Sequence, residues 1–351
     1  MRACPPAETL RAARRDSTLR ARDLAASLNV SEAALVAAHT GAPAPFSVTR
    51  IAADPDVLMP NMARLGRIMS LTRNDSCVLE RVGTFGDYHS GAHAAFVLGK
   101  EIDTRLFPKY WTYGFAVEEE TAKGLRRSLQ VFDRYGEALQ KIYLREESNT
   151  EAWAPLIAEL RLDDQSPEID PHAPPAPEGA RPAPGKREAL VAEWRKMTDT
   201  HQFNRICTRL GMNRLGAYRM AGAPFARRVA VSAVADWLEA VSAAHQRVGF
   251  FVGNRGHIQI HWGTFDTLKP MGPWLNVLDP EVNIHLRNDH IAEVYVVEKP
   301  TKRGPATSIE AFDARGELIF QCFGQRTETD ETLDGWHAIL DAIPSLREAA
   351  E

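Results

Sequence analysis

The chain has 351 residues, and its 42 basic and 46 acidic side chains give a formal charge of -4. This charge gives no general case for nucleic acid or an anionic membrane as partner, and no apolar run suits a signal peptide or a membrane span. The four cysteines are far apart without a CxxC pair, which disfavours a disulfide framework or a structural zinc site and fits a reducing cytoplasm.

In chain order, the first predicted elements are two short helices at residues 21–28 and 31–38. Ser31 is a plausible N-cap, because its side-chain oxygen can accept from a backbone N–H of the first turn. Residues 133–136, Asp-Arg-Tyr-Gly, are typical of a hairpin turn between strands. The proline-rich stretch 163–186 lacks the backbone donors that a sheet needs, so we expect a semi-extended linker.

After the linker, Leu-Gly-Met at residues 210–212 matches Leu-Asn-Val at 28–30 with an offset of 182. The second half is therefore also predicted to begin with a pair of helices. Asp-Ala-Arg-Gly at 313–316 repeats the hairpin turn between the last two of several predicted antiparallel strands. These strands are expected at residues 247–252, 257–262, 292–299, 307–312 and 317–323.

Residues 74–137 recur at 254–317 with a constant offset of 180. Seventeen of these 64 ungapped positions are identical, several times what composition alone would give. We therefore predict two tandem copies of one α+β unit, each a large antiparallel sheet with flanking helices, related by a pseudo-twofold axis. The expected organisation is a first repeat at 1–162, a linker at 163–186 and a second repeat at 187–351. Two large copies of this kind often pack face to face and form a site between them.

Chemistry is expected where the copies differ, because shared residues are explained by a shared scaffold. Arg105 stands opposite His285 in the repeat alignment, and other differences pair Lys141 with Gln321 and Tyr143 with Phe323. The most suggestive segment is 194–203, in which a threonine (198 or 200) or Asp199 can cap a helix whose first turn carries His201. The positive end of a helix favours neutral imidazole, the form that ligates metals. Taken alone, however, a histidine at a helix start is more often a capping or surface residue.

With these residues in view, the sequence resembles the HemS/HmuS family of bacterial cytoplasmic haem-utilisation proteins, often called haemin-degrading factors. The resemblance covers nearly the whole chain and includes a tandem duplication. The matching stretches are residues 21–25, 114–121, 199–203, 271–279 and 289–293.

The resemblance implies one haem bound in a cleft between the halves. It assigns His201 as the axial ligand of the haem iron and Arg105 to the opposite face. The groups that it places around the propionates are Arg214, Lys299, Gln321 and Arg326, consistent with the fit between cations and carboxylates. Phe323 stands where many relatives have tyrosine, which would remove one polar contact to the haem edge.

Each of these assignments has a plainer structural alternative. Lys299 could be a solvated residue at a sheet edge, and Arg214 could be a salt-bridging helix residue. Strict alternation puts Gln321 and Phe323 on one face but Arg326 on the other, unless the strand ends after Gly324 or bulges. Further histidines in the second copy are expected to be core or surface residues; they are His257, His261, His285 and His290.

Two functions of different classes follow from the resemblance. In the first, the protein is a haem-oxygenase-like enzyme: dioxygen or peroxide is activated at the iron opposite His201, and the ring is opened to release iron for the bacterium. No flavin or nicotinamide fingerprint is present, so a separate reductase must supply electrons. In the second, the protein is a carrier or store that takes haem from an inner-membrane importer to an acceptor. A third hypothesis, a two-lobed interaction module without haem, would gain support if His201 and Arg214 pointed away from the cleft.

Overall fold

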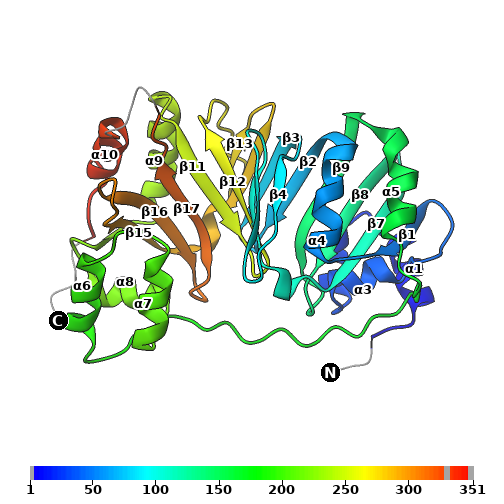
Figure 1. Ribbon diagram of the computed structural model, residues 1–351, viewed down its shortest axis with the longest axis horizontal. Coiled ribbons are helices and arrows are strands. Elements are labelled where there is room, and N and C mark those ends of the chain that lie inside the picture. The colour runs from blue at the N-terminus through cyan, green and yellow to red at the C-terminus, as the bar shows by residue number, and fades with distance from the viewer. Residues whose placement is uncertain (1–3, 328–332, 347–351) are drawn as a thin grey trace. The chain divides into compact units, whose positions relative to one another are not determined.

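The computed structural model describes residues 4–327 and 333–346, and the chain forms two compact units (Figure 1). The first unit comprises Met1–Arg73, Leu79–Pro175 and Gly253–Gln259. The second comprises Asn74–Val78, Ala176–Val252 and Ile260–Glu351. Each unit thus contains one short segment from the other half of the sequence. The expected repeat boundaries, the pseudo-twofold axis and the cleft between the halves stay predictions.

The first unit begins with three short helices, and a fourth and fifth follow later in its sequence. They are α1 (Ala7–Arg15), α2 (Ala21–Ser27), α3 (Glu32–Ala37), α4 (Pro55–Leu58) and α5 (Trp153–Leu160), with 3-10 turns at Met59–Leu65, Pro108–Tyr110 and Thr150–Ala152. Its strands are β1 (Phe46–Ile51), β2 (Gly66–Arg73), β3 (Cys77–Gly83), β4 (Asp87–His89), β5 (Ala95–Leu98), β6 (Asp103–Leu106), β7 (Tyr113–Thr121), β8 (Gly124–Phe132) and β9 (Ala138–Ser148).

The large sheet of the first unit runs in the order β1-β7-β8-β9-β2-β3, and β4, β5 and β6 pair side by side. On one face, Ala33 and Val36 of α3 pack against Phe115 and Phe132 of the sheet. On the other face, α5 packs against apolar side chains that include Leu129. Burial of apolar side chains on both faces is the main stabilising contribution to such a layered unit.

The second unit has the same plan. Its helices are α6 (Arg187–Arg195), α7 (Gln202–Leu210), α8 (Arg214–Ala221), α9 (Ala233–Ala243) and α10 (Asp334–Asp341), with a 3-10 turn at Asn288–His290. Its strands are β10 (Ala226–Val229), β11 (Val248–Gly253), β12 (His257–Gly263), β13 (Trp274–Leu278), β14 (Val282–Arg287), β15 (Ile291–Lys299), β16 (Ala306–Asp313) and β17 (Leu318–Gly324).

Its large sheet has the order β10-β15-β16-β17-β11-β12. Each of these strands is the repeat counterpart of the strand at the same place in the order of the first unit. Helices α6, α7 and α8 lie together against one face of this sheet (Figure 1), where Trp194 and Phe203 pack with Tyr295 and Phe312. Helices α9 and α10 meet the other face through Trp237 and Trp336, and Trp237 stacks on Phe320 of β17. The predicted α+β tandem repeat is therefore confirmed.

The exchanged segments are fixed by two asparagines that are 180 residues apart. Asn254 accepts from the backbone N–H groups of Gly256 and His257, and its Nδ2 donates to the Leu139 carbonyl at 2.8 Å and the Arg73 carbonyl at 3.0 Å. Asn74 turns its own segment in the same way and donates to the Ile319 carbonyl at 2.8 Å. Ile319 is the repeat counterpart of Leu139, so both repeats use the same hydrogen bond.

The proline-rich segment 163–186 contains no helix or strand, as expected. The segment is nevertheless anchored at two points, because the His172 N–H donates to the Arg134 carbonyl and the Asn213 amide donates to the Gly179 carbonyl. The Arg181 carbonyl lies against Gly216 so closely that a Cβ there would be only 2.0 Å away. Glycine at 216 therefore allows the linker to cross the start of α8.

Most predicted elements match the observed ones within one or two residues. Ser31 caps α3 by accepting from the Ala34 N–H at 3.1 Å, and Asn213 caps α8 in the same way through the Gly216 N–H. The hairpin turns end in Gly136 and Gly316, which have φ of 75° and 80°. No helix in the described residues is long and apolar enough to cross a membrane.

Candidate functional site

His201 stands at the start of α7 in the second unit, and its side chain is 91% exposed. It is the N-cap residue, because α7 begins at Gln202; the expectation that the first helical turn would carry His201 is therefore wrong by one residue. Asp199 lies two residues earlier, and its Oδ1 accepts from the His201 backbone N–H at 2.7 Å and from its Nδ1 at 2.7 Å. Two bonds from one carboxylate fix the direction of the imidazole ring.

The His201 N–H and then its ring hold the pKa of Asp199 below its usual range, so Asp199 is a carboxylate at neutral pH. A carboxylate accepts only, which places the proton of neutral His201 on Nδ1 and leaves the Nε2 lone pair free to bind a metal. Metal-ligating histidines commonly have this arrangement, because the carboxylate raises the basicity of the ligand. The geometry therefore suits His201 to axial ligation.

Arg214, the first residue of α8, contacts a buried carboxylate on β16. Its NH1 lies 2.8 Å from Oε2 of Glu310, and its NH2 lies 3.3 Å from Oδ1 of Asn204. The Arg214 side chain remains 23% exposed, whereas Glu310 is fully buried. The salt-bridging alternative for Arg214 is thus correct, but the residue also keeps one side toward the surface.

Lys299 ends β15 and is buried rather than solvated at a sheet edge, because β15 lies between β10 and β16. Its Nζ lies 2.8 Å from Oε1 of Glu310 and donates to the Tyr218 hydroxyl at 2.9 Å. The Tyr218 hydroxyl and the Ser308 hydroxyl complete the shell of Glu310 at 2.8 and 2.9 Å. The structure therefore brings Arg214 and Lys299 together, on one shared acid.

Gln321 and Phe323 of β17 lie on the same face of the sheet as Glu310 of β16, because Gln321 pairs directly with Glu310 and Phe323 pairs with Ser308. Both side chains are half-buried. β17 ends at Gly324, so Arg326 lies beyond the strand and escapes its alternation. The expected end of the strand is confirmed at this position.

Two aromatic side chains that the sequence did not single out lie beside Phe323. Phe251 of β11 meets Phe323 at 5.5 Å and Trp262 of β12 at 5.7 Å, both edge to face. All three rings are half-buried, whereas the aromatic residues under α6, α7 and α8 are nearly all buried. This face of the second unit thus offers an apolar surface with Gln321 beside it.

Arg105 lies in the first unit, on β6. Its NH1 pairs with the Asp103 carboxylate and donates to the Thr104 carbonyl at 3.0 Å. Its guanidinium lies 6.0 Å from the centre of the Phe96 ring, which stacks on His89. Because Arg105 belongs to the first unit and the other predicted site residues to the second, the structure does not test whether they form one site.

The remaining histidines named above have polar neighbours. His257 contacts Thr72, His285 contacts Asn276, His290 contacts Ser76, and His261 contacts the Thr264 carbonyl. Within the described ranges, no group of three or more acidic, cysteine and histidine side chains is arranged to hold a metal ion.

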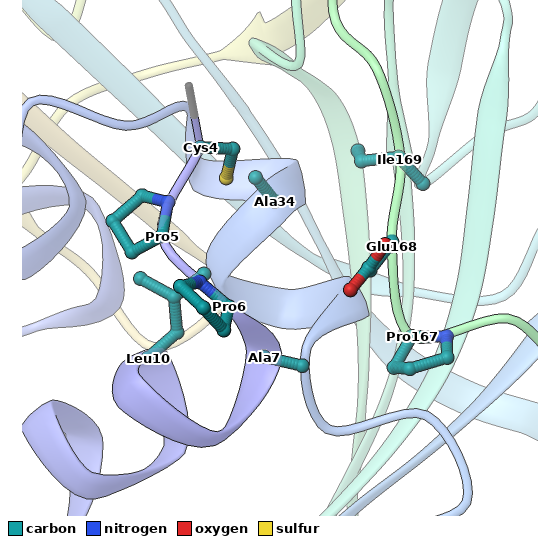
Figure 2. A pocket seen from close by; sticks show the side chains of 9 residues that line it. All are labelled: Cys4, Pro5, Pro6, Ala7, Leu10, Ala34, Pro167, Glu168 and Ile169. Carbon is teal, nitrogen blue, oxygen red and sulfur yellow. The ribbon is translucent and has the colours of Figure 1, made fainter. Parts of the chain in front are cut away.

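A separate hollow lies in the first unit between the N-terminal segment and the linker (Figure 2). Cys4, Leu10 and Ala34 line one side, and Glu168 and Ile169 line the other. Its volume of about 170 Å³ is below the ~300 Å³ at which small-molecule pockets begin. Burial and then Glu168 raise the pKa of the Cys4 thiol, which disfavours the reactive thiolate. None of the predicted site residues lines it.

The comparison with known protein families decides the relationship. The model of the haemin-degrading HemS.ChuX domain matches twice, at residues 29–160 and 211–343. The chain belongs to this HemS family. The two matches also agree with the duplication seen in the sequence and in the order of strands.

Several HemS relatives match over almost their full length. The hemin transport protein HemS of Yersinia enterocolitica is 36% identical over 317 residues, which are 90% of each chain. The crystal structure of holo-PhuS, a heme-binding protein from Pseudomonas aeruginosa, has a TM-score of 0.92 at 40% identity and covers 98% of this chain and 100% of its own. ChuS, an E. coli heme oxygenase, has a TM-score of 0.85 at 32% identity, and the match covers 95% of this chain and 99% of the ChuS chain.

One residue of the site, Glu310, was not predicted from the sequence, although the sequence of this HemS-family chain contained a signal for it. Glu310 stands where the first repeat has Gln130, which is a difference between the copies of the kind expected to carry chemistry. A buried charge is unusual, and here it has cations as partners. The half-exposed Phe251 and Trp262 gave no comparable signal, because apolar residues in a strand are ordinary.

Proposed function

We propose that this chain binds one haem through His201 and, with an external electron donor, opens the haem ring to release iron during bacterial haem uptake. The exposed imidazole of His201, with its Nδ1 held 2.7 Å from the Asp199 carboxylate, is the observation that carries the proposal. This pair fits a ferric or ferrous iron that needs one strong nitrogen donor. The family match and the names of PhuS, ChuS and HemS support the same ligand.

The propionates are proposed to meet Arg214, Gln321 and Arg326. A guanidinium matches the geometry of a carboxylate and stays charged at any physiological pH. Lys299 is proposed to support this group indirectly and not to contact the propionates. Its Nζ already contacts Glu310 and Tyr218, and its side chain is only 3% exposed.

The half-exposed rings of Phe323, Phe251 and Trp262 are proposed to pack against the porphyrin. A porphyrin is flat and apolar over most of its surface, so it gains from leaving water for an aromatic surface. Phenylalanine at 323 contributes such packing without the hydroxyl that tyrosine would bring.

Arg105 is proposed to serve the face of the haem opposite His201. Asp103 and the Thr104 carbonyl hold NH1 of its guanidinium, and the remaining N–H groups can donate to an oxygen species or a water. Bound haem supplies an iron centre that can activate dioxygen or peroxide, and the electrons come from a separate reductase. Arg105 and His201 are the residues that we assign to catalysis.

We further propose a cytoplasmic location, with an inner-membrane haem importer as the source of the ligand. All four cysteines are described and none forms a disulfide, which suits a reducing compartment. A carrier that passes haem to an acceptor is the second candidate. It is favoured by the 91% exposure of the His201 side chain, because an exposed axial ligand can be exchanged without opening the core.

The test is a visible-absorption titration of the purified protein with haemin, repeated on His201→Ala. The matched control is His245→Ala, another histidine whose side chain is 77% exposed. We expect a one-to-one Soret complex in the wild type and in the control, and a weaker, shifted complex in His201→Ala. A wild type without this complex would overturn the haem proposal.

The same complexes then separate the two candidates. Ascorbate or an NADPH-driven reductase is added in air with catalase present, and the Soret band is followed with time. Loss of the band together with a linear-tetrapyrrole spectrum supports the enzyme. An intact band that moves to an apo-acceptor supports the carrier and rejects ring opening.

A further inference from the structure

Glu310 has every acceptor position of its carboxylate filled from within the protein. Oε2 receives Arg214 and the Tyr218 hydroxyl, both at 2.8 Å, and Oε1 receives Lys299 at 2.8 Å and the Ser308 hydroxyl at 2.9 Å. An ionised carboxylate has about four lone-pair positions, so none is left for a ligand. Burial alone would raise the pKa of Glu310, but Lys299 and Arg214 bring it well below its usual range.

The two cations that contact Glu310 differ in how far their side chains are exposed to solvent. Lys299 is 3% exposed and lies over the rings of Phe203 and Tyr218, whereas the Arg214 side chain is 23% exposed. One acid and two cations leave one positive charge in excess. Since Lys299 is enclosed, this excess is available to a ligand only through Arg214.

The first repeat shows that the fold does not require an acid at this position. Its counterpart of Glu310 is Gln130, which is also buried and donates to Ser128 at 3.0 Å. Ser128 corresponds to Ser308, so both repeats have the serine, but only the second has a charged residue two positions later. The carboxylate therefore belongs to what distinguishes the second repeat.

We propose that Glu310 is a positioning residue for carboxylate recognition by Arg214. It holds NH1 of the guanidinium while NH2 contacts Asn204, so that the N–H groups left over keep a fixed direction toward a ligand. Lys299 neutralises Glu310 from the enclosed side, which leaves the charge of Arg214 for the ligand. This inference rests on the proposed function and adds how the propionate contact is set up.

The experiment compares iron protoporphyrin IX with its dimethyl ester, which keeps the iron and the ring but has no propionate charge. Dissociation constants for both are measured on the full chain by Soret titration, from the same detergent stock. The ratio of the two constants reports propionate recognition separately from axial ligation. We expect the wild type to favour the free acid roughly 10- to 100-fold, the range for a hydrogen bond between charged groups.

The decisive variant is Glu310→Gln with Lys299→Met, which removes one negative and one positive charge and so keeps the excess of one on Arg214. We expect the preference for the free acid to fall about tenfold while ester binding stays within about twofold. Arg214→Met should abolish the preference. Glu310→Asp, which keeps the charge but shortens its reach, should lower the preference by at least about threefold if the double variant does not fold.

The matched control is Glu32→Gln with Lys141→Met, which neutralises the corresponding buried pair of the first repeat and should leave the ratio unchanged. If the wild type forms no haem complex, the proposed function fails. If it binds haem without preferring the free acid, Arg214 recognition fails, and this inference with it. If the wild type shows the preference and both Glu310 variants retain it in full, Glu310 does not position Arg214, and the proposed function stands.

Discussion

The two repeats bury the same kind of charge cluster with the roles exchanged. In the first, the acid is Glu32 at the start of α3, held at 2.5 Å by Lys141 of β9 and by Arg73 of β2. In the second, the corresponding helix start is Arg214, and the acid is Glu310 in the sheet. Each cluster has one acid held by a lysine and an arginine, and Arg22 also acts on Glu32 in the first. The scaffold thus keeps a buried acid among cations, and in the second repeat Arg214 is the partly exposed member.

The segment before the second helix differs in the same sense. At the offset of 182, His201 corresponds to Leu19, and Asp199 corresponds to Ser17. Both Leu19 and His201 are exposed, so the position is open in each repeat. Only the second repeat places a metal-binding group there and supports it with a carboxylate. Divergence is therefore concentrated where it changes chemistry and leaves the fold intact.

Removal of the single acid from either cluster should have the largest effect on stability. Glu310→Gln leaves Lys299 enclosed without its counter-charge, and Glu32→Gln does the same to Lys141. We expect each to lower the free energy of unfolding by about 3–5 kcal/mol in urea titrations. Glu118→Gln, which breaks a half-exposed pair with Arg127, should lower it by less than about 1 kcal/mol. A similarly small loss in one repeat would show that its cluster does not depend on charge balance.

The asparagines of the exchanged segments should both contribute to stability. Asn254→Ala removes an amide that donates to the Leu139 and Arg73 carbonyls, whereas Asn74→Ala removes one that donates to the Ile319 carbonyl. Each substitution should lower the free energy of unfolding by about 1–3 kcal/mol. The control is Asn61→Ala, because Asn61 is near the surface, where it donates to the Val57 carbonyl and accepts from Arg64. A loss no larger than that of the control would mean that the asparagine does not fix its segment.

The first unit should also be sensitive to mild acid through His257. Its ring is fully buried, and burial lowers its pKa from 6.5 to about 3. The unfolded chain therefore binds this proton more readily, so stability is full above about pH 6.5 and falls as the pH drops toward 3. From pH 6.5 to 5 the loss should be about 2 kcal/mol, since one pH unit corresponds to about 1.4 kcal/mol.

The measurement is the slope of unfolding free energy against pH in the wild type and in His257→Gln. An amide of similar polarity can still contact Thr72 but cannot take up a proton. The slope between pH 6.5 and 5 should decrease in the variant. His39, whose pKa burial lowers to about 4, will account for part of the slope that remains. An unchanged slope would mean that His257 gains access to water or to another partner.

The duplication, the paired helices and the hairpin turns were predictable because they depend on local patterns. Ser31 and Asn213 cap their helices through side-chain oxygens, and the turn glycines adopt positive φ, which few other residues do readily. The exchange of Asn74–Val78 and Gly253–Gln259 was not predictable, because it depends on which body a strand end packs against. No local pattern carries that information.

The residues of the candidate site were predictable from the sequence, but which of them are buried and which are exposed was not. Lys299 could be expected at the surface, since lysine is seldom buried, and only its contact with Glu310 explains why it is enclosed. The contact of Arg105 with Asp103 could have been found, because residues two apart on a strand share a face. The exposure of His201 depends on the turn after α6, whose course the sequence did not reveal.

The support of His201 by Asp199 gives the last and smallest expected effect. Asp199→Ala should raise the dissociation constant for ferric haem about 10-fold, at the low end of the effects seen when a carboxylate behind a metal-bound histidine is lost. Asp199→Asn keeps a hydrogen-bond acceptor without the charge. Its dissociation constant should lie between those of Asp199→Ala and the wild type. The reduction potential of the bound iron should rise in both, because a less basic imidazole stabilises the ferric state less.

Asp289→Ala is the matched control, because Asp289 is also an exposed carboxylate close to a histidine, His290, and pairs with Arg287. It should change neither the affinity nor the potential. If Asp199→Ala binds haem as tightly as the wild type and with the same potential, the carboxylate serves only to hold the turn before α7. The second repeat would then differ from the first at this helix by the imidazole alone, and Leu19→His with Ser17→Asp in the first repeat would be needed to test whether position by itself makes a ligand.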